Sequence, residues 1–302
     1  RCHDLDELKR LLDLGSGEDM STLVDGIEAV IHTAAWVNFR KDQFERFHKI
    51  NTEGALRLFK AAQKAGVRRF VHVSTVAAVG AVRRDENGTD RIGRSRATED
   101  SKFNLDHVRI PYIQTKYAAE TRLIAQASDG DTELVIVNPS IIVAPSRTND
   151  DRRKARRLFA RLMLPDFPNR LNLVDIRDVA PAILVALKRG RPNHRYILSG
   201  DDITARELVL EVSAITGQMP HLVRVPRPLC NMAARAGLLA GKLFGRGKVS
   251  FYPELVKLLD YDWAFSSTKA RNEFRYQHRS LHITLENLLT NNFVGTWLRP
   301  EL

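Results

Sequence analysis

Short runs of apolar, often β-branched residues alternate with amphipathic segments along most of the chain. Three runs predict buried strands, at residues 28–35, 68–75 and 133–143. Between the first two, apolar residues at 55–62 follow the i, i+3, i+4, i+7 spacing of one helix face, and Gly66 is placed to end that helix. A second helix is expected from Tyr112 to Ala127, and a strand end followed by a helix is expected at residues 171–190.

This order of elements predicts an α/β fold with a doubly wound, Rossmann-like parallel sheet. Continuously apolar strands are typical of a parallel sheet that helices cover on both faces. In such a sheet a ligand binds beyond the carboxyl ends of the strands. From about Thr204 the pattern becomes mostly helical, which predicts a smaller C-terminal lobe.

The composition is that of an ordinary globular protein. The chain has 302 residues, of which 43% are hydrophobic and 27% charged. No apolar run approaches the roughly 18 residues of a transmembrane helix, so no membrane span is expected. The two cysteines, Cys2 and Cys230, form neither a disulfide framework nor a zinc-binding pattern. We therefore expect no metal site and a reducing, cytoplasmic compartment.

The chain is basic, with a formal net charge of +11. Such a balance can serve nucleic acid, an anionic membrane surface or an anionic small ligand. The densest cluster, residues 152–161, is interpreted first as a solvated helix face and second as a site for a phosphate-bearing ligand. Because no basic stripe is interleaved with aromatic residues and no zinc finger is present, nucleic acid is not an expected partner.

A phenol and an ammonium lie one helical turn apart at Tyr112 and Lys116. The spacing alone is a weak signal, but the hydroxyl of Thr75 follows a predicted strand and can reach the same crevice. A tyrosine that acts as a base near neutral pH needs its pKa lowered from about 10 to about 7, which requires roughly 4 kcal/mol of phenolate stabilisation. A nearby ammonium and a cationic nicotinamide can supply it, and Thr75 can orient the substrate oxygen.

Several short motifs occur in a fixed order over nearly the whole chain. They are IHTAA at 31–35, NTEGALRLFKAA at 51–62, VSTVAAVG at 73–80, YIQTK at 112–116, VNPSIIVAP at 137–145, LVDIRDVAPAILVAL at 173–187 and SSTKARNEF at 266–274. Together they resemble the extended short-chain dehydrogenases/reductases, in the group of NAD-dependent epimerases/dehydratases and 3β-hydroxysteroid dehydrogenases. The joint occurrence is far more specific than any one motif.

The resemblance implies a catalytic set of four residues. Tyr112 would be the acid/base, Lys116 its pKa modulator and a ligand of the ribose hydroxyls, Thr75 the carbonyl polariser, and Asn51 a structural and proton-relay partner. The residues implied to bind NAD or NADP are Asp13, Leu14, Thr33, Ala34, Ala35, Tyr112, Lys116, Pro139, Ser140 and Ile141. Among them, Asp13 and Leu14 resemble the acidic-aliphatic pair that contacts adenine.

The chain departs from the family at its start. The family opens with a Gly-x-x-Gly-x-x-Gly loop that binds pyrophosphate at a helix N-terminus, and this chain has no such loop. We therefore expect an N-terminally truncated form that lacks roughly one βαβ unit, on the order of 30 residues, with the choice between NAD and NADP open. Val79, where nucleotide-sugar epimerases usually have Tyr, and VNPS at 137–140 favour the dihydroflavonol-reductase-like and hydroxysteroid-dehydrogenase-like branches.

The expected domains are a dinucleotide-binding unit and a substrate-binding lobe. The first comprises residues 1–145, with residues 171–190 returning to it; the second comprises residues 146–170 and 191–302. His32 and His72 are expected to be packed side chains. Two readings stay open elsewhere: Asn51 could cap a helix, and the segment 36–39, which holds Trp36, Val37 and Phe39, could belong to the core or wall an apolar substrate pocket.

The leading hypothesis is an NAD(P)-dependent oxidoreductase that moves hydride between the cofactor and a secondary alcohol or ketone. One alternative is a nucleotide-sugar epimerase or dehydratase with a transiently oxidised substrate. Another is a non-catalytic cofactor-binding subunit. A small-molecule substrate is the expected partner, and a homodimer is left open.

Overall fold

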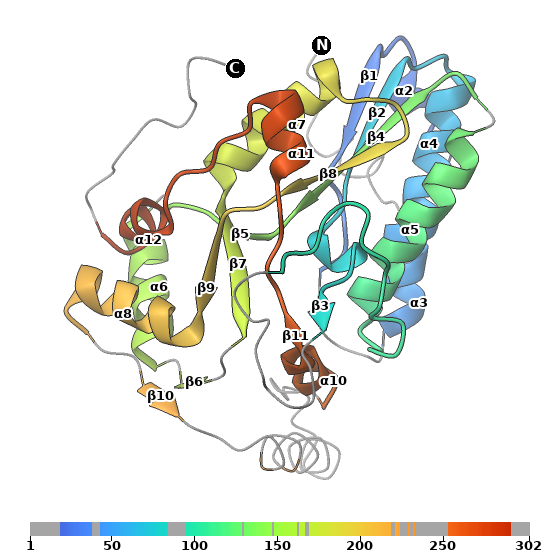
Figure 1. Cartoon of the computed structure of the whole chain (residues 1–302). Helices are drawn as coiled ribbons and strands as arrows, with labels where there is room; N and C mark the ends of the chain where they lie inside the picture. The colour runs from blue at the N-terminus through green and yellow to red at the C-terminus, as the bar shows by residue number, and fades with distance from the viewer. Residues whose placement is uncertain are drawn as a thin grey trace.

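The computed structural model contains a central four-stranded sheet (Figure 1). Its strands, all parallel and in the order β1-β2-β4-β8, are β1 Ala29–His32, β2 Arg69–Val73, β4 Glu133–Pro139 and β8 His194–Leu198. In the register, His32 lies opposite His72, and Val73 lies opposite Val137. The carboxyl ends of neighbouring strands therefore meet at one edge of the sheet.

The structure describes a large part of the chain in several ranges. These are residues 19–37, 43–83, 95–128, 130–146, 148–161, 163–166, 169–218, 221–223, 229, 232 and 253–290. The predictions for Asp13, Leu14 and Phe39 lie outside the described residues.

Helices cover both faces of the central sheet. One face carries α4 Ala55–Lys64 and α5 Pro111–Ala127, and the other carries α7 Ile176–Arg189 and α11 Thr268–Phe274. Successive residues of β2 point to opposite faces, so that Phe70 packs with Phe59 of α4 whereas Val71 packs with Val179 of α7. This double burial explains the continuously apolar strands, and the predicted doubly wound α/β fold is confirmed.

The helix expected after residue 51 forms, but its start is irregular. A short helix, α3 Phe44–Phe47, runs into a π-helical turn, η2 His48–Gly54, which leads into α4. The four residues of the predicted apolar face are all buried. Gly66 follows the helix with a φ of 71°, a left-handed conformation that costs glycine little.

The third apolar run forms two strands rather than one. β4 ends at Pro139, and after Ser140 the chain continues as β5 Ile141–Val143 in a different sheet. That second sheet has the order β5-β7-β9, with β7 Arg170–Asp175 parallel to β5 and antiparallel to β9 Asp201–Thr204. Apolar periodicity could not show the break, because β-branched apolar residues occur on both sides of residues 138–140.

The C-terminal part of the chain contributes to the central sheet, which differs from the sequence-based division. The sequence places all of residues 191–302 in the substrate lobe, whereas β8 is hydrogen-bonded to β4 and α11 packs against α7 and β8. Tyr196 of β8 is buried, and its ring lies 4.3 Å from that of Phe274 in α11. In Figure 1 the red α11 lies beside the yellow-green α7, far from it in sequence.

The second sheet carries its own helices. They are α6 Asn149–Arg161, α8 Ala205–Thr216 and α12 Leu281–Leu289, and α12 contacts both of the others. Thr204 begins α8 with a capping box that includes Glu207. Arg153, Lys154, Arg156 and Arg157 of the basic cluster are exposed on α6, where Lys154 pairs with Asp150 at 2.6 Å. This is the solvated helix face that the sequence favours.

Short elements complete the described structure. They are α2 Ser21–Val24, η3 Val76–Ala78, β3 Val82–Arg83, β6 Met163–Pro165, β10 His221–Val223, α10 Pro253–Lys257, η4 Leu258–Asp260 and β11 Tyr261–Asp262. β11 pairs with β3, and β10 pairs with β6.

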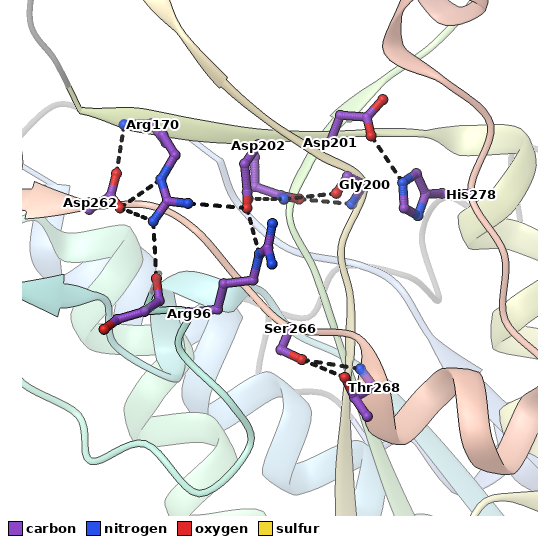
Figure 2. Close-up of polar contacts among 11 residues, drawn as sticks. Arg96, Arg170, Gly200, Asp201, Asp202, Asp262, Ser266, Thr268 and His278 are labelled. Atoms are coloured by element: carbon purple, nitrogen blue, oxygen red, sulfur yellow. Dashed lines mark hydrogen bonds and ion pairs between the residues drawn. The ribbon is translucent and has the colours of Figure 1, made fainter. Parts of the chain in front are cut away.

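An ion-pair network joins four segments beside the second sheet (Figure 2). Asp262 of β11 accepts hydrogen bonds from the backbone N and the Nε of Arg170, at 2.7 and 2.8 Å. Arg170 Nη1 lies 3.7 Å from Oδ2 of Asp202, and Nε of Arg96 donates to the same oxygen at 2.7 Å. The side chains of Asp262 and Asp202 are 3% and 7% exposed, whereas that of Arg96 is 52% exposed. The network ties Arg96 and β11 to strands β7 and β9.

Candidate active site

The carboxyl ends of three central strands carry residues expected to surround a ligand. β1 is followed by Thr33, β2 by Ser74 and β4 by Ser140. After β1, Thr33 and Ala34 are exposed and Ala35 is half-buried. The backbone at this strand end is therefore open to a ligand.

The hydroxyl of Thr75 lies beside the phenol of Tyr112 and lowers the pKa of that phenol. Thr75 precedes η3, where its Oγ1 accepts a hydrogen bond from the backbone N of Ala77 at 3.3 Å. Tyr112 lies in the first turn of α5, which packs on η3 and begins with Pro111, a residue that suits a helix start. Two hydroxyls from separate elements are therefore neighbours.

The pKa of Tyr112 lies above its ordinary value of 10.0 in this structure, because the phenol is buried. The Thr75 hydroxyl acts in the opposite direction and lowers it. The lowering of this pKa by the ammonium of Lys116, which the sequence analysis expects, stays a prediction. Lys116 is directed elsewhere: its Nζ donates to the carbonyl oxygen of Val73 at 2.7 Å.

Lys116 lies one turn after Tyr112 on the buried face of α5. Its side chain is 2% exposed, and burial lowers its pKa from 10.5 to about 8, with Glu120 opposing that shift. An ammonium has three N–H donors, of which Val73 accepts one. Within the described part of the chain, two donors are thus left for a further acceptor.

Asn51 joins the loop after β1 to helix α5. Its Oδ1 accepts from the backbone N of Trp36 at 2.7 Å, and its Nδ2 donates to the carbonyl of Trp36 at 3.0 Å and to Thr115 Oγ1 at 3.3 Å. Because Asn51 lies inside η2 rather than at its start, the alternative of a helix cap is wrong. Trp36 is itself covered by Arg46, whose guanidinium carbon lies 3.9 Å from the ring centre.

The segment expected beside the nicotinamide spans the passage from β4 to β5. Pro139 and Ser140 are buried, and Ile141 is 50% exposed. The Ser140 hydroxyl is buried and has no hydrogen-bond partner among the described residues. An unpartnered buried hydroxyl at a strand end is suited to a bound ligand.

Two buried polar residues of this region escaped the sequence analysis. Asn138, the penultimate residue of β4, donates from Nδ2 to the carbonyl of Thr75 at 3.0 Å and to Glu120 Oε1 at 2.6 Å. Glu120 lies one turn after Lys116 on α5 and is 2% exposed. The available signal was the i, i+4, i+8 spacing of Tyr112, Lys116 and Glu120 along one helix face.

His32 and His72 are packed side chains, as expected. Their ring centres lie 5.3 Å apart across β1 and β2. Burial lowers the pKa of His32 to about 3 and that of His72 well below 6.5, and Lys116 acts in the same direction on both. Both imidazoles are therefore neutral near pH 7, and neither adds charge to the site.

The described residues fit the ribose and nicotinamide half of a dinucleotide. Lys116 offers unused N–H donors, Ser140 a buried hydroxyl without a partner, and Thr33 and Ala34 an exposed backbone. The residues implied to contact adenine, Asp13 and Leu14, lie outside the described residues.

Other features of the described chain do not compete with this site. Three surface depressions of about 730, 780 and 490 Å³ are all lined by Lys60 on the outer side of α4, away from the strand ends. Within the described ranges, no group of three or more His, Cys, Asp or Glu is placed to hold a metal ion. None of the helices formed by the described residues has the length and apolar character needed to cross a bilayer.

Known proteins share this sequence and architecture. The family model described as the NAD dependent epimerase/dehydratase family matches residues 6–199. A protein of Synechocystis sp., provisionally named dihydroflavonol 4-reductase, is 33% identical over 68% of this chain, and the match spans 58% of that protein. Sterol demethylase protein B of Methylococcus capsulatus is 27% identical over 86% of this chain and 77% of its own length. The crystal structure of gox2253 matches with a TM-score of 0.72 and 26% identity, covering 92% of this chain and 82% of that chain.

Proposed function

Because the chain belongs to the NAD-dependent epimerase/dehydratase family, we propose that it is an NAD(P)-dependent oxidoreductase acting on a secondary alcohol or ketone. The observation that carries the proposal is the proximity of the Thr75 hydroxyl to the Tyr112 phenol, one helical turn from the buried ammonium of Lys116. These are the side chains that proton transfer to or from a carbonyl oxygen requires.

The bound cofactor supplies the hydride acceptor or donor and, when oxidised, a positive charge. Tyr112 removes the proton from the substrate hydroxyl during oxidation and returns a proton to the oxygen during reduction. Thr75, beside the phenol, orients the substrate oxygen. Lys116 holds the ribose hydroxyls with its remaining N–H donors and favours the phenolate through its charge. Burial raises the pKa of Tyr112 in the protein alone, so charges in its surroundings must lower it for base catalysis near neutral pH.

Asn51 has a positioning role in this proposal. It binds both backbone polar groups of Trp36 and the hydroxyl of Thr115, which lies between Tyr112 and Lys116 on α5. It therefore fixes the distance between the open loop after β1 and the helix that carries the acid/base.

We infer that the substrate is apolar. Three large apolar side chains at the ends of β1 and β4 are exposed: Val37 at 62%, Ile141 at 50% and Ile142 at 42%. Exposed apolar groups beside a few convergent polar ones are typical of sites for apolar ligands. The relative named sterol demethylase protein B agrees with this direction.

The test uses the full-length protein with NADH or NADPH and a panel of sterol ketones and nucleotide sugars. We expect net oxidation of the reduced cofactor with an apolar ketone. Tyr112→Phe should lower turnover by at least roughly 10²-fold and leave cofactor affinity nearly unchanged. Conversion of a nucleotide sugar with no net change in reduced cofactor would support the epimerase alternative instead.

Tyr117→Phe is the matched control on the same helix. Its ring stacks on Phe103 at 3.8 Å, outside the proposed proton path, so turnover should be retained. Full turnover in Tyr112→Phe would refute the assignment of the acid/base.

A further inference from the structure

Helix α5 buries a carboxyl group behind the proposed reaction centre. Glu120 is 2% exposed and lies on the same helix face as Ala119, Leu123 and Ala127, which are all apolar and buried. An apolar side chain would pack on this buried helix face without an electrostatic cost. A buried carboxyl group, by contrast, is unfavourable unless it is paired and hydrogen-bonded. Its presence calls for an explanation in terms of its partners.

The partners of Glu120 belong to two central strands, β4 and β8. Oε1 accepts a hydrogen bond of 2.6 Å from Asn138 Nδ2 of β4, and that same nitrogen donates to the carbonyl of Thr75 at 3.0 Å. Oε2 lies 3.6 Å from Arg195 Nη1 of β8. The carboxyl group therefore connects α5, through one amide, to the backbone of the residue that orients the substrate.

The charged and titratable groups around Lys116 identify the second contact of this carboxyl. His32 of β1 and His72 of β2 both face Lys116, and burial keeps both neutral near pH 7. Glu120 is the group that opposes the lowering of the pKa of Lys116 by burial. The pKa of Glu120 is itself raised by burial, while Ser74, Arg195, Asn138 and Lys116 each lower it.

We propose that Glu120 is a positioning residue of the active site, acting through Asn138 on Thr75 and through its charge on Lys116. This inference rests on the proposed function. In it, the carboxylate keeps Lys116 protonated one turn from the phenol, and the Asn138 amide fixes the Thr75 backbone relative to α5. Arg195, supplied by the later strand β8, favours the ionised form of the carboxyl group against the effect of burial.

The test compares wild-type protein with Glu120→Gln, which removes the charge and keeps the shape. The first measurement follows the Cε resonance of Lys116 by NMR as the pH changes, in protein without cofactor or substrate. The pKa of Lys116, about 8 in the wild type, should fall by about one unit when the neighbouring charge is lost. The alkaline limb of the pH profile of ketone reduction should move to lower pH in parallel, because Lys116 loses its proton earlier.

Glu133→Gln is the matched control. Glu133 also forms an ion pair, accepting from Arg69 Nε at 2.7 Å, but it lies at the opposite end of β4. The titration of Lys116 and the pH profile should not change in this variant. A merely structural role of Glu120 would leave both readouts in Glu120→Gln as they are in Glu133→Gln, and that result would overturn the proposal.

Arg195→Gln provides a second variant in case Glu120→Gln does not fold. The side chain of Arg195 is 25% exposed, so the substitution is tolerated more easily. Losing the guanidinium favours protonation of Glu120, so the pKa of Lys116 should fall, by less than in Glu120→Gln. An unchanged Lys116 titration in Arg195→Gln would also refute the proposal.

The NMR titration keeps the two proposals separable. If Tyr112→Phe retains turnover, the proposed function fails, while the Lys116 titration still reports on Glu120. If turnover depends on Tyr112 but neither the titration nor the pH profile responds to Glu120→Gln, the positioning role alone fails.

Discussion

The buried groups of α5 and the ion-pair network of Figure 2 use similar side chains in different ways. In the network, Arg170 contacts Asp262 directly through its backbone N, Nε and Nη2. On α5, Lys116 bonds to a backbone carbonyl and Glu120 to an amide. The pKa of Lys116 is lowered and that of Glu120 is raised, each toward its neutral form.

The contrast separates charges that hold the fold from charges that adjust a site. A direct, multidentate pair satisfies both ions and fixes their geometry. Lys116 and Glu120 are hydrogen-bonded to neutral groups, so small changes in their surroundings can shift their pKa values. Shifted pKa values of this kind are typical of functional sites. Four substitutions test this distinction, from the largest expected effect to the smallest.

Asp262→Ala should give the largest loss of stability. It removes the direct, multidentate partner of Arg170, whose side chain is 11% exposed, and leaves the nearly buried guanidinium with the longer 3.7 Å pair to Asp202. The free energy of unfolding should fall by about 3–5 kcal/mol, measured by urea denaturation. Asp106→Ala, at a side chain that is 84% exposed, should change it by less than about 0.5 kcal/mol. Similar losses in the two variants would contradict the structural role.

Lys116→Met should change stability in a way that depends on pH. The folded-state pKa of Lys116, about 8, lies below its ordinary value of 10.5. The contribution of Lys116 to folding stability is therefore present above pH 10.5 and is lost as the pH falls to 8. Relative to Lys116→Met, the wild type should gain up to about 3 kcal/mol between pH 8 and 10.5. Lys60→Met, at an exposed position of α4, should show no such pH dependence. If the difference in unfolding free energy between the wild type and Lys116→Met did not change with pH, the lowered pKa of the buried Lys116 would be disproved.

Thr75→Val should affect catalysis more than folding. It removes the hydroxyl beside Tyr112 and keeps a β-branched side chain of similar shape. We expect kcat/KM to fall by roughly 10²-fold, with an unfolding free energy within about 1 kcal/mol of the wild type. Thr75→Ser should retain most activity. Equal losses in the Val and Ser variants would argue against a role of the hydroxyl.

Arg96→Ala should have the smallest effect, although Arg96 belongs to the same network as Arg170. Its side chain is 52% exposed, so water screens its pair with Asp202. The expected loss is about 0–1 kcal/mol and should shrink as salt is added. If the loss of stability were as large as that of Asp262→Ala and persisted at high salt, solvent exposure would not decide how much each ion pair of this network stabilises the fold.

The predictable parts of the molecule are those encoded by local pattern. The strands around Phe70 and Val135, the face of α4 and the start of α5 at Pro111 follow from periodicity and turn chemistry, which act within a few residues. The meeting of Thr75 and Tyr112 follows from the rule that ligands lie at the carboxyl ends of parallel strands.

The parts that sequence could not supply depend on distant segments. The break at Ser140 is set by the pairing of β5 with β7, and the place of β8 by its pairing with β4. The environment of Glu120 needs Asn138 and Arg195, which belong to other elements. The direction of the pKa shift of Tyr112 depends on burial and on the hydrogen bond that Lys116 donates to the carbonyl of Val73. A spacing of four residues reveals neither of them.

The position of β8 beside β4 also bears on how the polypeptide acquires its shape during synthesis. When Gly190 has left the ribosome, three of the four central strands exist and β4 is an open edge, which is a site for mispairing. The nascent sheet closes only after residues 194–198 emerge, and its last covering helix, α11, arrives later still. Much of the second sheet is therefore synthesised before the central sheet is complete, so the two halves mature together rather than in sequence.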